Sequence, residues 1–109
     1  MDSKLIVARM NVLSSIIVAK TFAEFDATEL PGRTATSRRQ LFAYHGLYLH
    51  LQDFGTGDGG AVIEAGEGDP GFAGISEDLR PHIAAYNPAA RLSSADSVAT
   101  CFYDWTASS

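Results

Sequence analysis

The sequence predicts a single α+β domain, residues 1–109, in which four antiparallel strands and two helices follow the ferredoxin-like order strand–helix–strand–strand–helix–strand. Two observations lead to this prediction. A strong hairpin signal occupies the middle of the chain, and a helical pattern of apolar residues lies on either side of it. In this arrangement both helices cover one face of the sheet and leave the other face bare.

The first half of the chain reads as a strand followed by a helix. Residues 5–10 form a short apolar run typical of a strand, and Asn11 can cap a helix that begins at Val12. Pro31 and Gly32 are expected to end it. The predicted inward stripe of this helix steps by four and three residues through Val12, Ile16, Ala19, Ala23, Asp26 and Leu30.

Residues 34–53 read as two strands folded on a tight turn at His45-Gly46, because glycine tolerates the positive φ that such turns require. A two-residue turn there pairs Tyr44 with Leu47, Ala43 with Tyr48, Phe42 with Leu49, Leu41 with His50 and Arg39 with Gln52. Paired residues share a face. One face is then apolar (Phe42, Tyr44, Leu47, Leu49, Leu51), and the other carries reactive groups (Arg39, Leu41, Tyr48, His50, Gln52).

The second half predicts a helix and a final strand. Asp69-Pro70 is a good helix start, and Pro81 should break or kink that helix. Residues 97–106 alternate as a strand does. Residues 55–60 match G-x-G-x-x-G, but they follow a hairpin strand rather than a parallel strand that leads into a helix. They therefore predict a flexible loop and not a nucleotide site.

Composition excludes several classes of function. The net charge of −5 argues against nucleic acid or an anionic membrane as the partner. Cys101 is the single cysteine, which rules out an internal disulfide, and with three histidines it matches no familiar metal-binding spacing. No apolar run could span a membrane, and the N-terminus lacks a signal-peptide pattern. We expect a cytoplasmic protein that acts on a small molecule or on another protein.

The bare, apolar hairpin face is too hydrophobic to leave in water, so we expect a homodimer in which two sheets pack face to face. The opposite hairpin face then turns toward the helices. There Arg39 and His50 should meet Asp26 in a space walled by Ile16, Phe22 and Leu79.

These three side chains suggest acid–base chemistry. A neutral His50 can accept a proton, Arg39 can stabilise an oxyanion, and Asp26 can orient either of them. The plainer interpretation is a satisfied ion pair beside a hydrogen-bonded histidine. His82 falls on the inward stripe of the second helix and could line the cavity. Tyr48 and Trp105 are expected in its wall, where Tyr48 could donate a hydrogen bond to substrate.

Several segments resemble the tetracenomycin-type aromatic polyketide cyclases. They are Tyr44-His45-Gly46-Leu47-Tyr48-Leu49-His50-Leu51, the ending Phe102-Tyr103-Asp104-Trp105, and residues 22–31, 38–42, 69–72 and 75–79. The resemblance implies a ferredoxin-like homodimer, a dimeric α+β barrel, without metal or organic cofactor. It also implies closure and aromatisation of a late polyketide ring by aldol condensation and loss of water.

The site residues that the resemblance implies are Asp26, Arg39 and His50, the same three that the predicted hairpin and helix bring together. Some family members have a histidine just before the aspartate, and this chain has Phe25 there. If that histidine is a required acid or base, this chain has lost it or uses His50 alone. Phe25 is expected among the substrate-binding residues. Two other functions fit the same scaffold: a cofactor-free monooxygenase that oxidises an aromatic polyketide to a quinone, and a non-catalytic polyketide-binding module.

Overall fold

The computed structural model describes residues 2–33, 35–55, 70–86, 97–105 and 107. The elements in chain order are β1 (Asp2–Met10), a 3₁₀ turn (Val12–Ser14), α1 (Ser15–Asp26), α2 (Leu30–Arg33), β2 (Thr36–Tyr44), β3 (Leu47–Phe54), α4 (Pro70–Leu79) and β4 (Ile83–Ala85). Most of residues 55–60 and the predicted cap Asp69 lie outside the described residues.

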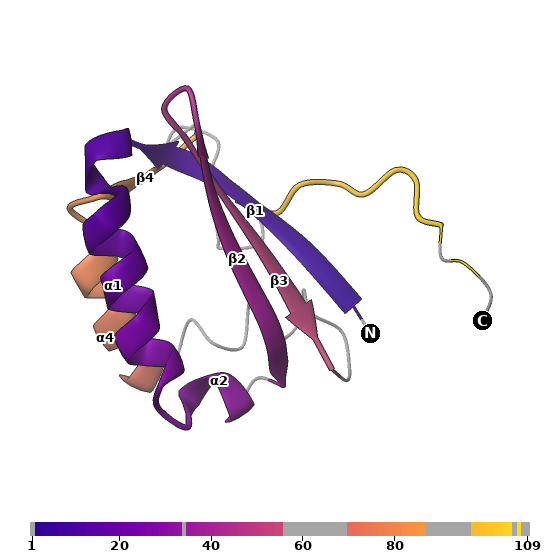
Figure 1. Ribbon diagram of the computed structural model, residues 1–109, viewed down its shortest axis with the longest axis horizontal. Coiled ribbons are helices and arrows are strands. Elements are labelled where there is room, and N and C mark those ends of the chain that lie inside the picture. Colours follow the sequence, from indigo (N-terminus) through magenta and orange to yellow (C-terminus); the bar gives the residue numbers. More distant parts are fainter. Residues whose placement is uncertain (1, 34, 56–69, 87–96, 106, 108–109) are drawn as a thin grey trace.

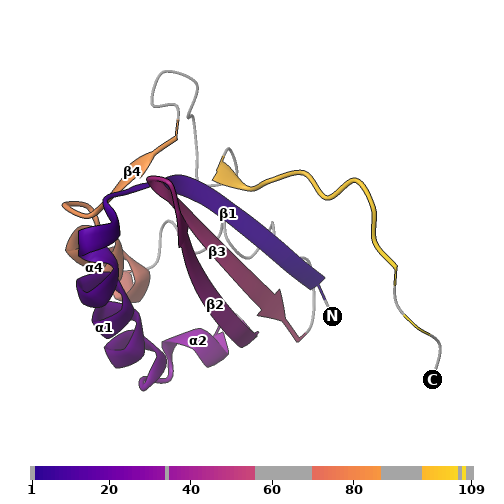
Figure 2. The ribbon, with the colours of Figure 1, turned by 45° about the horizontal axis from the view of Figure 1, so that its top comes forward.

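The four strands form one antiparallel sheet in the order β2-β3-β1-β4. Figures 1 and 2 show α1 and α4 together on one side of this sheet. The rings of Phe25 on α1 and Phe72 on α4 lie 5.7 Å apart, so the two helices contact each other as well as the strands. The predicted α+β fold, a four-stranded antiparallel sheet with its helices on one face, is confirmed.

The hairpin has the predicted register, with all five predicted pairs present. Both turn residues have positive φ, 47° at His45 and 80° at Gly46, which is the backbone of a type I′ turn. Burial alternates along β3: its odd-numbered residues are half-buried, and its even-numbered ones, Tyr48, His50, Gln52 and Phe54, are buried. The reactive face of the hairpin therefore turns toward the protein interior.

The predicted stripe of the first helix was wrong. Val18 and Phe22 are the buried residues of α1, whereas Ile16 is 80% exposed and Val12 is 60% exposed. Residues 12–14 form a 3₁₀ turn, which has three residues per turn, so the α-helical spacing counted from Val12 points to the wrong face. The helix also ends at Asp26 rather than Leu30, and Pro31 and Gly32 belong to the separate helix α2.

The predicted final strand at residues 97–106 was also wrong. The fourth strand is β4, which follows the turn at Pro81 and pairs with residues 8–10 of β1. Of the later residues, Val98 forms an isolated bridge to Ile6, and Ala99 N–H donates to Leu5 O over 2.7 Å. Residues 101–105 then leave the sheet, on the side away from the helices (Figure 1). Alternation of apolar and polar residues does not decide whether residues 83–85 or residues 97–106 pair with the free edge of β1.

The core lies between the sheet and α1. Its buried residues are Ala8, Met10, Val18, Phe22 and Tyr48, with Leu41, Ile75, Leu79 and Ile83 among the half-buried residues packed against it. Tyr48 is thus both a core residue and a member of the reactive hairpin face. In the part of the chain that the structure describes, no helix has the length and apolarity needed to cross a membrane.

The turn makes a first prediction. Gly46→Ala should lower the free energy of unfolding by about 1 kcal/mol, because an alanine is strained at φ 80° although an added Cβ meets nothing within 4 Å. The matched control is Gly74→Ala in the interior of α4, where φ is not positive and the same change should raise stability by roughly 0.5–1 kcal/mol. Urea unfolding of both variants checks the prediction, and effects of the same sign would contradict it.

Candidate functional site

Arg39 brings the three predicted catalytic residues together. Its Nε lies 3.2 and 3.1 Å from the two carboxylate oxygens of Asp26, and its Nη2 lies 3.0 Å from Asp26 Oδ1. Its Nη1 lies 2.9 Å from His50 Nε2. Asp26 is the last residue of α1, Arg39 stands on β2 and His50 on β3. The distances among the three side chains thus depend on how the C-terminal end of α1 packs over the hairpin of β2 and β3.

A fourth residue extends this group. Tyr48 Oη lies 2.9 Å from His50 Nδ1, so both nitrogens of the imidazole are engaged. We call Asp26, Arg39, His50 and Tyr48 the polar chain. Tyr48 and His50 lie two residues apart on the buried face of β3, which is why their side chains meet.

Aromatic rings surround the polar chain. The Arg39 guanidinium carbon lies 4.8 Å from the Phe22 ring centre and 5.7 Å from that of Phe25. Phe22 also meets the His50 ring edge-on at 5.3 Å. The Arg39 side chain is 9% exposed and that of Asp26 is 38% exposed, so the cation is removed from water while its partner reaches the surface. Phe22 and Phe25 therefore lie against the polar chain.

Burial decides the charge state of His50. Desolvation, followed by the positive charge of Arg39, lowers the pKa of His50 from 6.5 to about 3. The imidazole is neutral near pH 7, and Nε2 already accepts a hydrogen bond, because a guanidinium can only donate. Burial likewise raises the pKa of Tyr48 far above its usual range, so the phenol stays protonated.

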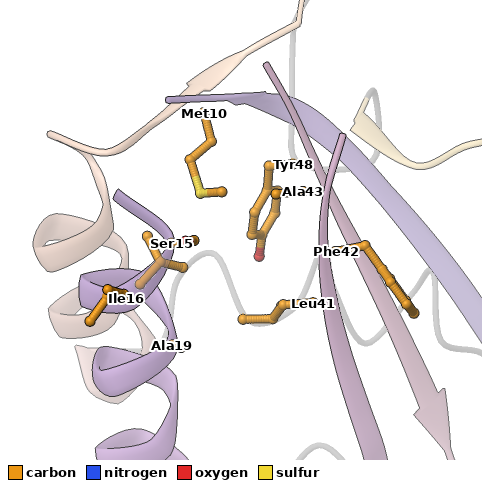
Figure 3. A pocket seen from close by; sticks show the side chains of 9 residues that line it. Met10, Ser15, Ile16, Ala19, Leu41, Phe42, Ala43 and Tyr48 are labelled. Carbon is orange, nitrogen blue, oxygen red and sulfur yellow. The ribbon is translucent and has the colours of Figure 1, made fainter. Parts of the chain in front are cut away.

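One pocket of about 300 Å³ lies between α1 and the edge strand β2. Figure 3 shows Tyr48 in its wall, with the hydroxyl oxygen directed toward Leu41. Besides Tyr48, the lining is almost entirely apolar: Met10, Ser15, Ile16, Val18, Ala19, Leu41, Phe42 and Ala43. Of the predicted site residues, Tyr48 is the one that belongs both to this lining and to the polar chain.

Two predicted site residues lie elsewhere. His82 follows the end of α4 instead of lying on its inward stripe, because the helix stops at Leu79 before Pro81, and its Nδ1 lies 3.2 Å from Ser14 Oγ. Trp105 is 71% exposed and does not line the pocket, because residues 101–105 are not a strand of the sheet.

Sequence reasoning missed Met10 and Ser15 as lining residues. Met10 is the last residue of β1 and Ser15 the first of α1, so both depend on where the chain turns from strand to helix. The pairing of Leu41 with His50 was the signal that placed Leu41 on the inner face. Within the described ranges, no three or more His, Cys, Asp or Glu side chains gather where they could hold a metal ion.

The lowered pKa of His50 makes a second prediction. An unfolded chain protonates this histidine near pH 6.5 and the folded protein only near pH 3, so stability is lost as pH falls through that window. Between pH 7 and 5 the wild type should lose about 2 kcal/mol more unfolding free energy than His50→Gln, which cannot titrate. Denaturant unfolding at both pH values measures this difference, and parallel losses would contradict it.

Comparison with known proteins identifies the family of the chain. The model of the polyketide synthesis cyclase family matches residues 2–106. An uncharacterized protein of Streptomyces coelicolor is 42% identical over 106 residues, covering 96% of this chain and 95% of the relative. Tetracenomycin F2 cyclase of Streptomyces glaucescens is 35% identical over 103 residues, covering 94% of this chain and 93% of the relative.

The solved structure of tetracenomycin F2 cyclase from Streptomyces glaucescens, described as a type-II polyketide cyclase, superposes on this fold with a TM-score of 0.90. The sequences are 33% identical in that comparison, which covers 99% of this chain and 100% of the other. The fold and the sequence thus lead to the same relatives. The chain belongs to the polyketide synthesis cyclase family, as its resemblance to the tetracenomycin-type aromatic polyketide cyclases indicates.

Proposed function

We propose that this protein closes and aromatises a late ring of a partly cyclised poly-β-keto chain in type II polyketide biosynthesis, by intramolecular aldol condensation and loss of water. Family membership supports an enzyme of polyketide cyclisation. The observation that carries the chemical step is the buried Arg39 cation, hydrogen-bonded to a neutral His50, next to an apolar pocket.

The reaction needs a pocket that folds the chain and a positive potential that stabilises its oxyanions. A methylene between two carbonyls loses its proton, its carbon bonds to a distant carbonyl carbon, and that oxygen takes up a proton. Loss of the resulting hydroxyl with a neighbouring hydrogen, as water, then gives the aromatic ring. The apolar pocket folds the chain so that the two carbons meet, and a fixed positive potential stabilises the enolate and alkoxide oxygens as charge develops.

In this proposal Arg39 supplies that potential, while Asp26 holds the guanidinium in place. His50 is not the base that its sequence position suggests, because its Nε2 is occupied and its pKa is lowered to about 3. Instead, His50 links Arg39 to Tyr48 by hydrogen bonds, so that the positive charge of Arg39 polarises a side chain that lines the pocket. A methylene flanked by two carbonyls is acidic enough to give its proton to solvent water once the enolate oxygen is stabilised.

A third prediction tests this function. The purified protein, incubated with a naphthacenone-type partly cyclised polyketide, should convert it to a product lighter by one water, with and without oxygen, as read by mass spectrometry. Arg39→Ala should lower the rate about 100-fold or more, since it removes the charge that stabilises the oxyanion. Arg38→Ala is the matched control, because Arg38 is an exposed neighbour in β2. Its rate should stay within about twofold of the wild-type rate, far above that of Arg39→Ala.

Each other outcome has a distinct meaning. A product that gains oxygen only in air would move the protein to the cofactor-free monooxygenases. If the wild type and both variants bind the substrate and none of them converts it, the result would favour a non-catalytic binding module. Equal losses in Arg38→Ala and Arg39→Ala would contradict the assignment of the site.

We further propose that the protein is a homodimer formed through the outer face of the hairpin. On this face Phe42 is 48% exposed and Tyr44 is 63% exposed, and the half-buried Leu47, Leu49 and Leu51 lie beside them. Both long helices lie on the other side of the sheet (Figures 1 and 2). A contiguous apolar face of this kind is typical of a protein–protein contact.

The fourth prediction concerns this dimer. Light scattering after gel filtration should give twice the chain mass for the wild type, whereas Leu49→Arg should give a folded monomer, because it places a charge in the centre of the apolar face. Leu13→Arg is the control, since Leu13 is 82% exposed and precedes α1 on the helical side. A monomeric wild type, or a Leu49→Arg dimer, would contradict the proposal.

A further inference from the structure

The Tyr48 side chain connects the polar chain with the pocket. Its hydroxyl oxygen lies 2.9 Å from His50 Nδ1, and the same side chain lines the space between α1 and β2. Asp26, Arg39 and His50 do not line that pocket. The hydrogen-bonded connection from the buried cation to a molecule in the pocket therefore passes through this phenol.

The hydrogen bonds of the polar chain have a fixed direction. A guanidinium has only donors, so Arg39 Nη1 donates and His50 Nε2 accepts. A neutral imidazole carries one proton, which must then be on Nδ1, and this N–H donates to Tyr48 Oη. The tautomer of His50 thus follows from the chemistry of its neighbour.

This direction leaves the Tyr48 hydroxyl hydrogen uncommitted. Its oxygen accepts from His50, and the structure records no second partner for it among the described residues. Tyr48 is 4% exposed, and the other residues that line its pocket are almost entirely apolar, so few side chains there could accept the hydrogen. A buried hydroxyl normally finds an acceptor, and a carbonyl oxygen of a molecule in the pocket would provide one.

We propose that the Tyr48 hydroxyl is the catalytic group that donates a hydrogen bond to the substrate oxygen on which negative charge develops. Arg39 and His50 are then positioning residues that polarise it. The proposal rests on the proposed function in that the ligand is a β-dicarbonyl chain. Successive donors that point the same way strengthen one another where the local dielectric is low, so the cation acts on the substrate without touching it.

The substrate class follows from this geometry. The ligand must present a carbonyl or enolate oxygen to Tyr48, and its carbon skeleton must occupy an apolar space of about 300 Å³. An enolisable aromatic 1,3-diketone satisfies both conditions. Its enolate should be favoured in the pocket over its neutral form, because a hydrogen bond to the charged oxygen is about twice as strong as one to a neutral oxygen.

The fifth prediction uses Tyr48→Phe, which keeps the ring and removes the hydroxyl. With the naphthacenone-type substrate, this variant should lose about 100-fold in kcat with KM nearly unchanged, since the hydrogen bond strengthens as charge develops. Tyr86→Phe is the matched control, because Tyr86 is exposed and lies outside the pocket lining, and its kcat should not change.

A second readout does not depend on turnover. Dibenzoylmethane, a 1,3-diketone whose enolate has a distinct absorbance, should show a lowered pKa when bound to the wild type. In Tyr48→Phe that shift should shrink by about one unit or more, equivalent to a tenfold change in the enolate equilibrium. If Tyr48→Phe does not fold, replacement of Tyr48 by 3-fluorotyrosine, a more acidic phenol, should lower the bound pKa further.

The two readouts separate the two proposals. Loss of both kcat and the pKa shift in Tyr48→Phe, with Tyr86→Phe unaffected, is the expected result. A wild type that shifts the diketone pKa through Tyr48 but forms no product would overturn the proposed function and leave the donor in place. Unchanged kcat and unchanged pKa shift in Tyr48→Phe would overturn the donor.

Discussion

The buried guanidinium of Arg39 is the constraint on which the rest of the site depends. Removing a cation from water is costly unless its hydrogen bonds are met, and here Asp26 provides a carboxylate while Phe22 and Phe25 provide aromatic faces. On the other side of the guanidinium, Nη1 meets His50. Because arginine cannot accept, this single contact determines which nitrogen of His50 carries the proton and in which direction the whole polar chain points.

The fold explains why this chain of groups reaches a pocket. Asp26 closes α1 at one end, whereas Ser15 opens it at the pocket, and Tyr48 lies on the strand beneath the helix. The alternation of β3 turns polar side chains toward the helices. The buried face of the sheet therefore carries the site residues Tyr48 and His50 as well as apolar core residues. Its other face is apolar and uncovered by helices, which leaves it available for a second copy of the chain.

The sequence predicted the site better than it predicted the outer elements. Arg39, His50 and Tyr48 share a face because the His45-Gly46 turn sets the hairpin register, and that signal is contained in a few neighbouring residues. The inward face of α1 depended on a 3₁₀ turn that periodicity does not reveal. The fourth strand depended on which segment, residues 83–85 or residues 97–106, reached the edge of β1, and strand propensity alone does not decide that.

The direction of the polar chain requires that Arg39 hold His50 as a neutral ring protonated at Nδ1. Long-range ¹H–¹⁵N spectroscopy of the histidine-labelled protein tests it directly, because it distinguishes a protonated ring nitrogen from a bare one. We expect a bare Nε2 and a protonated Nδ1 for His50, unchanged across the range in which an ordinary histidine titrates. A His50 that titrates near pH 6.5, or one protonated at Nε2, would show that Arg39 does not fix the tautomer.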